Sequence, residues 1–210
     1  LAETGEALIN RSKAVPEKSE TAMPKKPGTG LLIREGGCAV NSEPTCDREK
    51  SVCFTGHRII SRKDSADLMP KLYSTVTQLA ADGYDTFICG GAVGFDTDAA
   101  ECVLGLKERG ADLRLILALP CRDQTVKWND TESVKRYKKI LGSADGVVYA
   151  EDFYTSDCMH RRNRWMADNS SVCVAYCKHT RGGSVYTVKY ALKNGLQVIN
   201  LADECDTDQC

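Results

Sequence analysis

Short apolar runs alternate with longer segments of helical periodicity from residue 51 to residue 201. The apolar runs predict strands at 51–56, 85–91, 113–120, 146–150, 171–177 and 196–201. The segments between them predict helices at 65–83, 96–110, 131–144, 158–170 and 184–195. Such alternation is typical of a mainly parallel sheet with helices on both faces. Since crossovers between parallel strands are right-handed, we expect an α/β, Rossmann-like, doubly wound fold.

The first fifty residues have a different composition. They contain four of the six prolines, no Phe, Trp or Tyr, and eight basic residues against eight acidic ones. A segment like this buries too little apolar surface to offset the entropy of ordering it. We therefore predict a low-complexity or disordered extension at 1–50, in which LLIREGG at 31–37 is compatible with a short strand or an edge contact. One domain at 51–203 and an acidic tail at 204–210 complete the predicted organisation.

Charge and hydropathy exclude several classes of protein. The formal net charge is −1 at pH 7, which gives no overall attraction to nucleic acid or to an anionic membrane. No apolar run approaches the roughly 18 residues that span a bilayer, and the N-terminus does not resemble a signal peptide. We therefore expect a cytoplasmic protein with no membrane partner, for which nucleic acid is a disfavoured partner. A homo-oligomer is compatible with the sequence.

The eleven cysteines are spread along the chain and include no C-x-x-C pair. An odd number with this spacing does not fit a secreted disulfide framework. Zinc would need a tighter spacing of ligands, and His57, His160 and His179 are the three histidines that could supplement the thiols. We therefore expect the cysteines to serve as small core hydrophobes in a reducing compartment, with no metal site and no cofactor.

The loops after the strands carry the functional signal, because ligands of such sheets bind beyond the carboxyl ends of the strands. The first predicted strand ends in TGHR (55–58), the second in GGAVGFD (90–96) and the fifth in KHTRGGS (178–184). In the last two, a glycine pair opens a helix, where unpaired N–H groups and a partial positive charge attract phosphate. Glycines also make tight turns that bind nothing. Two such loops in one sheet favour phosphate binding.

Neither glycine loop belongs to a common nucleotide enzyme. No G-K-[ST] follows either pair, and neither has the spacing G-x-G-x-x-G, so P-loop ATPases and ordinary dehydrogenases are disfavoured. Asp96 either complements the dipole of its helix or accepts a hydrogen bond from a ribose or a base. His57 either contacts phosphate, acts as an acid, or is a plain turn residue.

Further candidates lie in the segments that follow. In HRRNR (160–164), Arg162 and Asn163 either face the cleft, which we favour because this helix begins just past the fourth strand, or belong to a solvated basic face. Trp128 and Tyr137 flank a basic helix and could stack on a base. For both aromatic residues, packing in the core is the preferred interpretation.

The motifs CFTGHR, GGAVGFD, CMHRRNRWMAD and GGSVYTVKYA together resemble the SLOG superfamily, and within it the YpsA-like branch. The resemblance covers about 51–201. It implies a Rossmann-like fold, shared with DprA and with the Lonely Guy phosphoribohydrolases, and a nucleotide-derived ligand at the strand ends. Carried over by position, and with His57 added from its place in TGHR, it implies ligand-binding roles for Thr55, Gly56, His57, Arg58, Gly90, Gly91, Gly94, Asp96, Arg162, Asn163, Gly182, Gly183 and Ser184.

Three functions stay open. The first is binding or sensing of a nucleotide-derived ligand similar to ADP-ribose or NAD, the second is cleavage of an N-glycosidic bond in a nucleotide, and the third is binding of single-stranded DNA as in DprA. The net charge disfavours the third. The Lonely Guy pattern has a glutamate after its glycine loop, whereas 181–201 contains no Asp or Glu. Asp96, Glu101 and His57 are weak catalytic candidates, so we predict ligand binding without efficient hydrolysis.

Overall fold

The computed structural model describes residues 44–126 and 128–202. Its strands are β1 (Ser51–Gly56), β2 (Thr86–Cys89), β3 (Arg114–Leu119), β4 (Gly146–Tyr149), β5 (Val172–Tyr176) and β6 (Gln197–Asn200). Its α-helices are α1 (Arg62–Ala81), α2 (Phe95–Glu108), α3 (Thr131–Ser143), α4 (Cys158–Asp168) and α5 (Gly183–Lys193). The predicted order of strands and helices is confirmed, with shifts of a few residues at the ends. The runs at 31–37 and 204–210 lie outside the described residues.

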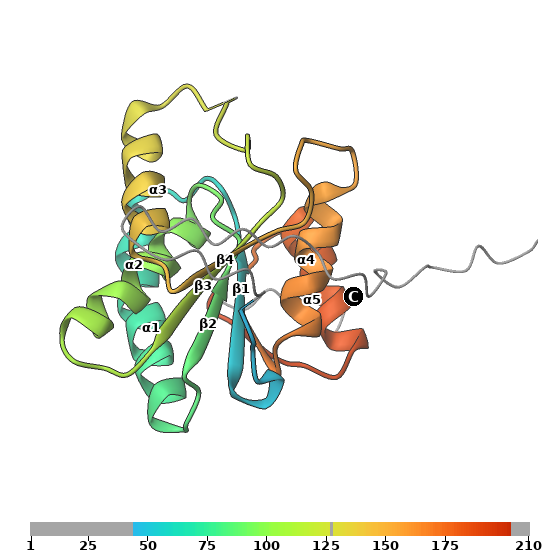
Figure 1. Ribbon diagram of the computed structural model, residues 1–210. Coiled ribbons are helices and arrows are strands. Elements are labelled where there is room, and N and C mark those ends of the chain that lie inside the picture. The colour runs from blue at the N-terminus through green and yellow to red at the C-terminus, as the bar shows by residue number, and fades with distance from the viewer. Residues whose placement is uncertain (1–43, 127, 203–210) are drawn as a thin grey trace, which may run out of the picture.

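The six strands form one parallel sheet in the order β4-β3-β2-β1-β5-β6. The helices α1, α2 and α3 cover one face of the sheet, and α4 and α5 cover the other (Figure 1). The chain builds outward from β1 to β4 and then crosses back to the other side of β1 to form β5. The connections that leave β1 and β5 therefore go to opposite faces, which opens a crevice at the carboxyl ends of these central strands. The α/β, Rossmann-like prediction is confirmed.

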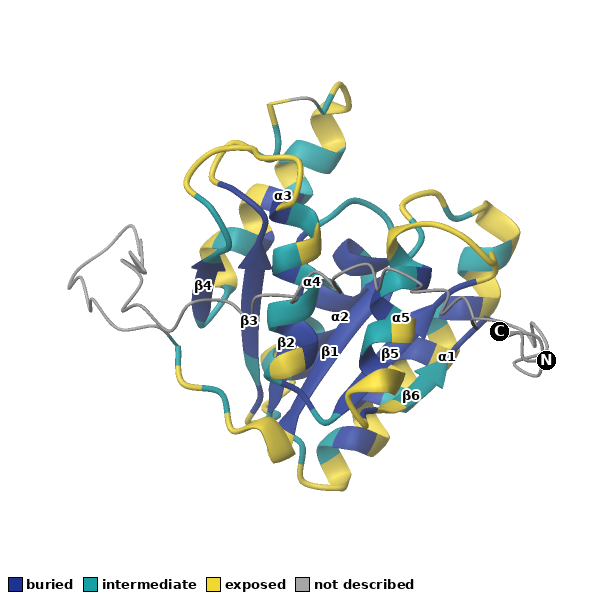
Figure 2. Cartoon of the chain, turned by 90° about the vertical axis from the view of Figure 1, so that its right-hand side faces the viewer, coloured by how far each residue is buried: buried dark blue, intermediate teal, exposed yellow. Residues whose placement is uncertain are grey.

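Apolar side chains on both faces of the sheet form the core. On the side of α1 to α3, the ring of Phe54 stacks on that of Phe87 with centroids 6.0 Å apart and meets Phe95 of α2 edge to face at 6.3 Å. On the side of α4 and α5, buried Met166 and Ala191 belong to a second apolar cluster. Figure 2 shows the strands as the buried layer between the helices. Seven of the eight described cysteines are buried, as expected for small core hydrophobes.

The chain segment before β1 packs on the domain. A short 3-10 helix spans Arg48–Lys50, and the Ser51 hydroxyl donates to the Asp47 carbonyl over 2.6 Å. A Cβ atom on Gly146 would lie 3.0 Å from the Pro44 side chain, so this proline covers the start of β4. The sequence assigned 44–50 to the extension, because it is polar and contains a proline. Its contacts join it to the domain, which therefore includes Pro44.

The starts of α1, α2, α3 and α5 fall into two kinds. Ser61 and Asp130 accept backbone N–H groups of the first turns of α1 and α3, as N-cap side chains do. Glycines, Gly94 and Gly182, stand at the same position of α2 and α5 and give no side-chain cap. Both of these helices begin at the crevice between the central strands. None of the helices among residues 44–126 and 128–202 is long and apolar enough to cross a membrane.

Candidate functional site

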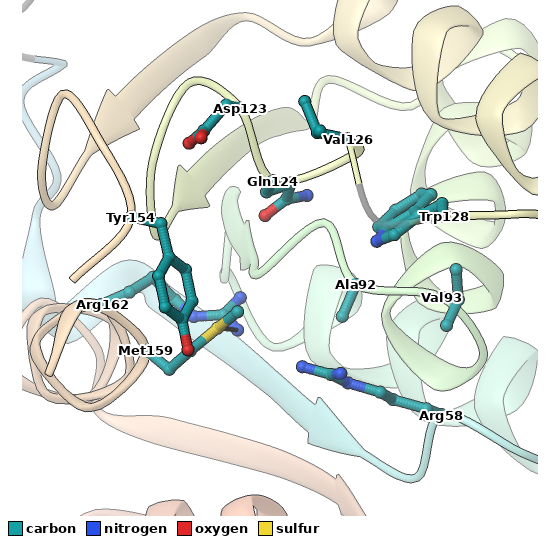
Figure 3. Close-up of a pocket in the computed structure, with 10 residues that line it drawn as sticks. All are labelled: Arg58, Ala92, Val93, Asp123, Gln124, Val126, Trp128, Tyr154, Met159 and Arg162. Carbon is teal, nitrogen blue, oxygen red and sulfur yellow. Dashed lines mark hydrogen bonds between the residues drawn. The ribbon is translucent and has the colours of Figure 1, made fainter. Parts of the chain in front are cut away.

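A bipartite cleft lies at the carboxyl ends of the strands. Its smaller part, the β1 compartment, has a volume of about 290 Å³ and is lined by Phe54, Thr55, Gly56, His57, Arg58, Ala92, Asp96, Met159, Arg162, Asn163, Met166, Gly183 and Ser184. Its larger part, the Trp128 compartment, has a volume of about 320 Å³ and is lined by Arg58, Ala92, Val93, Asp123, Gln124, Val126, Trp128, Tyr154, Met159 and Arg162 (Figure 3). Four residues line both compartments, so the two compartments adjoin.

Arg162 and Asp96 form a buried ion pair at the junction of the compartments. The side chains are 7% and 8% exposed, and Arg162 Nη1 lies 3.7 Å from Asp96 Oδ2. The same Asp96 oxygen accepts the Ala92 N–H over 3.2 Å. Burial lowers the pKa of Arg162 and raises the pKa of Asp96, and the opposite charge of each partner counteracts the shift of the other. The sequence predicted that Arg162 faces the cleft, and the structure places it there.

The guanidinium of Arg162 has unused hydrogen-bonding capacity. Neither Nε nor Nη1 has a hydrogen-bond partner in the described part of the chain, and both atoms are buried. Nη2 makes a long contact of 4.0 Å to the Met159 sulfur. Buried donors without partners are rare, because each costs desolvation energy that no hydrogen bond returns. A cationic group in this state at the wall of a cavity is suited to an anionic or acceptor group of a ligand.

Gly90 makes room for this arginine. A Cβ atom on Gly90 would lie 1.6 Å from Arg162 Nη1 and 2.6 Å from Asp96 Oδ2. Any side chain there would displace the guanidinium or the carboxylate. Gly90 does not itself line either compartment. Its physical role is therefore to admit a side chain of the protein, and direct contact between Gly90 and a phosphate stays a prediction.

The other two glycines of this loop also contact protein atoms. At Gly94, where φ is 80°, a Cβ atom would lie 2.5 Å from the Arg58 carbonyl oxygen. The next residue, Phe95, donates its N–H to the His57 carbonyl over 3.1 Å, which ties the start of α2 to the loop after β1. At Gly91, a Cβ atom would lie 2.7 Å from Leu119 Cδ2. Neither glycine lines the cleft, so the glycines of the first loop shape the site by packing, while Ala92 and Val93 of the same loop and Asp96 at the start of α2 line it.

The second glycine loop is open. No atom lies within 4 Å of a Cβ position on Gly182 or Gly183. Gly183 and Ser184 line the β1 compartment at the start of α5, and the Ser184 hydroxyl donates to the Gly56 carbonyl over 2.7 Å. Gly182 is the N-cap residue of α5, has a φ of 119° and provides no side-chain cap, and it lies just outside the lining. The first turn of α5 thus presents an uncapped, electropositive helix end to the cavity that Arg162 also lines.

The end of β1 contributes Thr55 and Gly56 to the lining of the cleft, and the loop after it contributes His57 and Arg58. His57 Nε2 accepts the backbone N–H of Lys178 over 2.7 Å, so the proton of the neutral ring is on Nδ1. Partial burial lowers the pKa of His57, and the charges of His179 and Lys178 lower it further. His57 is therefore neutral near pH 7 and fixes the loop after β5, which disfavours a role as a cationic phosphate ligand.

Two predicted residues lie away from the cleft. Glu101 accepts hydrogen bonds from Arg136 of α3 at 2.9 Å and 2.7 Å and lines neither compartment, so it is withdrawn as a catalytic candidate. Tyr137 is buried in the core, as predicted. Trp128 packs edge to face on Tyr137, with centroids 5.4 Å apart, and also lines the cleft. The core interpretation of Trp128 was incomplete, because one face of the indole packs on the core while the ring still borders the cavity.

Several lining residues carried no signal in the sequence. Gln124 and Asp123 follow β3, Tyr154 follows β4, and Met159 is in the first turn of α4. The β3–α3 and β4–α4 loops have no glycine pair, no regular period and no known motif. Only the convergence of all strand ends at one edge of the sheet could have pointed to them. No group of three or more His, Cys, Asp or Glu side chains suited to a metal occurs within 44–126 and 128–202.

Three related bacterial proteins have names that mention no ligand. The chain is 28% identical over 142 residues to the SPbeta prophage-derived protein YoqJ of Bacillus subtilis, covering 61% of this chain and 82% of YoqJ. It is 24% identical over 166 residues to a UPF0398 protein of Staphylococcus haemolyticus, covering 75% of this chain and 87% of the relative. A UPF0398 protein of Bacillus cereus is 26% identical over 127 residues, with 59% and 68% covered.

Two solved structures share the fold. DNA processing protein A (DprA) of Streptococcus pneumoniae matches with a TM-score of 0.55 and 16% identity over 75% of this chain, which spans about half, 52%, of the DprA chain. DprA of Helicobacter pylori, described for its single-stranded DNA binding mode, matches with a TM-score of 0.57 and 18% identity, covering 77% of this chain and 68% of its own.

The family model described as the YspA SLOG family, YpsA, matches residues 61–201. Since this match covers more than half of the chain, the chain belongs to the YpsA SLOG family.

Proposed function

We propose that the protein binds a nucleotide-derived small molecule, of the ADP-ribose or NAD type, in the bipartite cleft and acts as a cytoplasmic sensing or regulatory module. The observation that carries this proposal is the buried Arg162, whose Nε and Nη1 have no hydrogen-bond partner in the described residues. An arginine in this state gains most from a planar or anionic acceptor such as a phosphate. The description of the matching family names no ligand, so the choice of ligand class rests on the chemistry of the cleft.

The two compartments differ in chemistry, which suits a ligand with two unlike parts. At their junction, Arg58 and Arg162 supply positive charge, and Figure 3 shows the Arg58 side chain extending across the opening toward Met159 and Arg162. The electropositive start of α5 borders the β1 compartment. Trp128 and Tyr154 offer aromatic surface in the other compartment. A phosphate at the junction would place a base in the Trp128 compartment and a sugar or second phosphate in the β1 compartment.

Asp96 favours binding over hydrolysis. Its carboxylate is held by Arg162 and by the Ala92 N–H, and burial raises its pKa. A carboxylate that activates water needs access to that water and a lone pair that is not already engaged. The ion pair uses Asp96 to neutralise Arg162 at the floor of the cleft, which is a structural and electrostatic role.

Isothermal titration with ADP-ribose, NAD and ADP tests the proposal. Arg58→Gln removes an exposed charge from the junction with little effect on folding. We expect it to weaken binding of the tightest ligand at least tenfold, since hydrogen bonds to charged groups are stronger than those between neutral groups. Arg181→Gln is the matched control, because Arg181 is exposed on the loop after β5 but lines neither compartment. If no ligand binds, or if both variants bind as the wild type does, the cleft is not the site.

Single-stranded DNA is a second candidate. The fold neighbours are DprA proteins, one of which is described by its single-stranded DNA binding mode. One observation on this chain favours it: Tyr154 and Val126, which line the Trp128 compartment, expose 54% and 78% of their surface, and Phe153, next to Tyr154 in the chain, exposes 78%. Exposed aromatic rings stack on unpaired bases. Fluorescence anisotropy of a labelled oligonucleotide at low salt, with ADP-ribose as a competitor, separates the two candidates.

A further inference from the structure

The amide of Gln124 has a fixed orientation in the wall of the Trp128 compartment. Its Nε2 donates to the Gly91 carbonyl oxygen over 2.7 Å. A carbonyl oxygen only accepts hydrogen bonds, so the nitrogen of the amide must face Gly91 and the oxygen must face the other way. Gln124 lines the compartment, and Figure 3 shows its oxygen directed toward the open centre, on the side of Tyr154. The wall therefore presents a positioned hydrogen-bond acceptor.

Gly91 makes this orientation rigid. Its backbone has a φ of 64°, and a Cβ atom there would lie 2.7 Å from Leu119 and 3.3 Å from Gln124 Nε2. A side chain at this position would push the amide away from the carbonyl that holds it. The loop after β2 thus fixes a side chain of the loop after β3, and the sequence separation of 33 residues hides this link.

The acceptor lies among surfaces suited to a base. Trp128 and Tyr154 lie on opposite sides of the opening in Figure 3, and Gln124 lies between them along the wall. The carboxylate of Asp123 lines the same wall and is also an acceptor. The arginines that would hold a phosphate are at the other end of the compartment, where it joins the β1 compartment.

We propose that Gln124 selects a nucleobase that carries an exocyclic amino group, as adenine and cytosine do, over the same ring with a carbonyl at that position. This inference rests on the proposed nucleotide site and adds the class of base. The amino group donates to Gln124 Oε1, whereas the carbonyl of hypoxanthine or uracil places an acceptor against an acceptor and leaves both without a hydrogen bond. Sites that pair a polar ligand group reject the analogue that lacks it, because their own polar atom then stays unpaired.

Two matched ligand pairs test this selection: ADP against IDP, and CDP against UDP, each pair differing in the amino or carbonyl group and in the proton on the adjacent ring nitrogen. By isothermal titration we expect at least one amino-bearing nucleotide to bind the wild type about tenfold more tightly than its partner, the effect of one lost hydrogen bond with an unpaired acceptor. In Gln124→Met, a variant of similar size, the preference should fall to about twofold or less, because the amino-bearing nucleotide loses its acceptor and the carbonyl-bearing nucleotide no longer leaves that acceptor unpaired.

Val126→Ala controls for general disturbance of this wall, because Val126 lines the same compartment from the same loop and has no polar side-chain atom. It should weaken all four ligands to the same degree and keep the preference. Equal affinity of the wild type within both pairs would overturn the role of Gln124 and leave the nucleotide site intact. A preference that persists in Gln124→Met, with the variant folded by its melting curve, would also overturn it. Failure of all four ligands to bind would refute the proposed function, and this inference with it.

Discussion

Gly90→Ala tests the arrangement at the floor of the cleft. The added Cβ atom would lie 1.6 Å from Arg162 Nη1, inside any permitted contact distance, so the guanidinium must move. Arg162 is buried, and its carboxylate partner lies 2.6 Å from the same Cβ position, which leaves little space for the movement. Overpacking of a buried site costs about 1–3 kcal/mol, and a domain of this size loses about 2–4 °C in melting temperature per kcal/mol. We expect a fall of about 2–12 °C and a loss of at least tenfold in ligand affinity.

Two controls separate this clash from a general effect of replacing glycine. Gly105→Ala adds the same methyl group inside α2, where no atom lies within 4 Å, and alanine is favoured over glycine in a helix by about 0.5–1 kcal/mol. This variant should melt about 1–4 °C higher than the wild type. In an Arg162→Ala background, Gly90→Ala should cost less than in the wild type, because the closest clash is gone and only the 2.6 Å approach to Asp96 Oδ2 remains.

The assay is thermal unfolding followed by circular dichroism, together with isothermal titration of the tightest nucleotide found. A Gly90→Ala protein that melts and binds as the wild type does would refute the reasoning. So would an equal cost of Gly90→Ala in the presence and in the absence of Arg162. In either case the guanidinium would not occupy the space that glycine leaves.

Two further predictions concern His57 and Asp96. Because the folded protein lowers the pKa of His57, the unfolded chain takes up the proton first as the pH falls below about 6.5. The melting temperature of the wild type should therefore fall between pH 7 and pH 5.5, and that of His57→Gln should fall less. Melting curves of the two proteins across this pH range test the prediction, and equal losses would contradict it. Nucleoside monophosphates incubated with the protein should release no free base at a rate near the 1 s⁻¹ or more that is typical of enzymes. Turnover at that rate, abolished in Asp96→Asn, would make Asp96 catalytic and overturn the binding role.

The sequence was sufficient to predict the elements of the fold because the inner strands β3, β2, β1 and β5 are largely apolar runs, as strands covered on both faces must be. It was not sufficient for the strand order. The crossover from β4 back to β5 depends on how helices pack on two faces of the sheet, and no local pattern encodes that step. The boundary at residue 50 failed for a similar reason, since Pro44 is part of the domain through a contact with Gly146, about a hundred residues away in the sequence.

The candidate site was predicted in part. Of the thirteen residues expected to bind ligand, nine line the cleft, and the four that do not are Gly90, Gly91, Gly94 and Gly182. A glycine at a strand end signals close approach of some atom, but it does not say whether that atom belongs to a ligand or to the protein. The sequence did not identify Gln124, because the feature that singles it out is its hydrogen bond to the Gly91 carbonyl. These two residues come together only after folding.

Gly90, Asp96 and Arg162 act as one unit, although they lie in two motifs about seventy residues apart. The missing side chain of Gly90 gives Arg162 its space, and Asp96 compensates its charge. Arg162 lines both compartments, and its buried Nε and Nη1 have no hydrogen-bond partner among the described residues. A glycine-rich loop of this kind needs no phosphate in direct contact with its glycines to serve a phosphate site. The bare backbone at Gly90 lets an arginine from the opposite face of the sheet reach across the strand end, and in the proposed function this arginine, rather than the glycines, would contact the anionic group of the ligand.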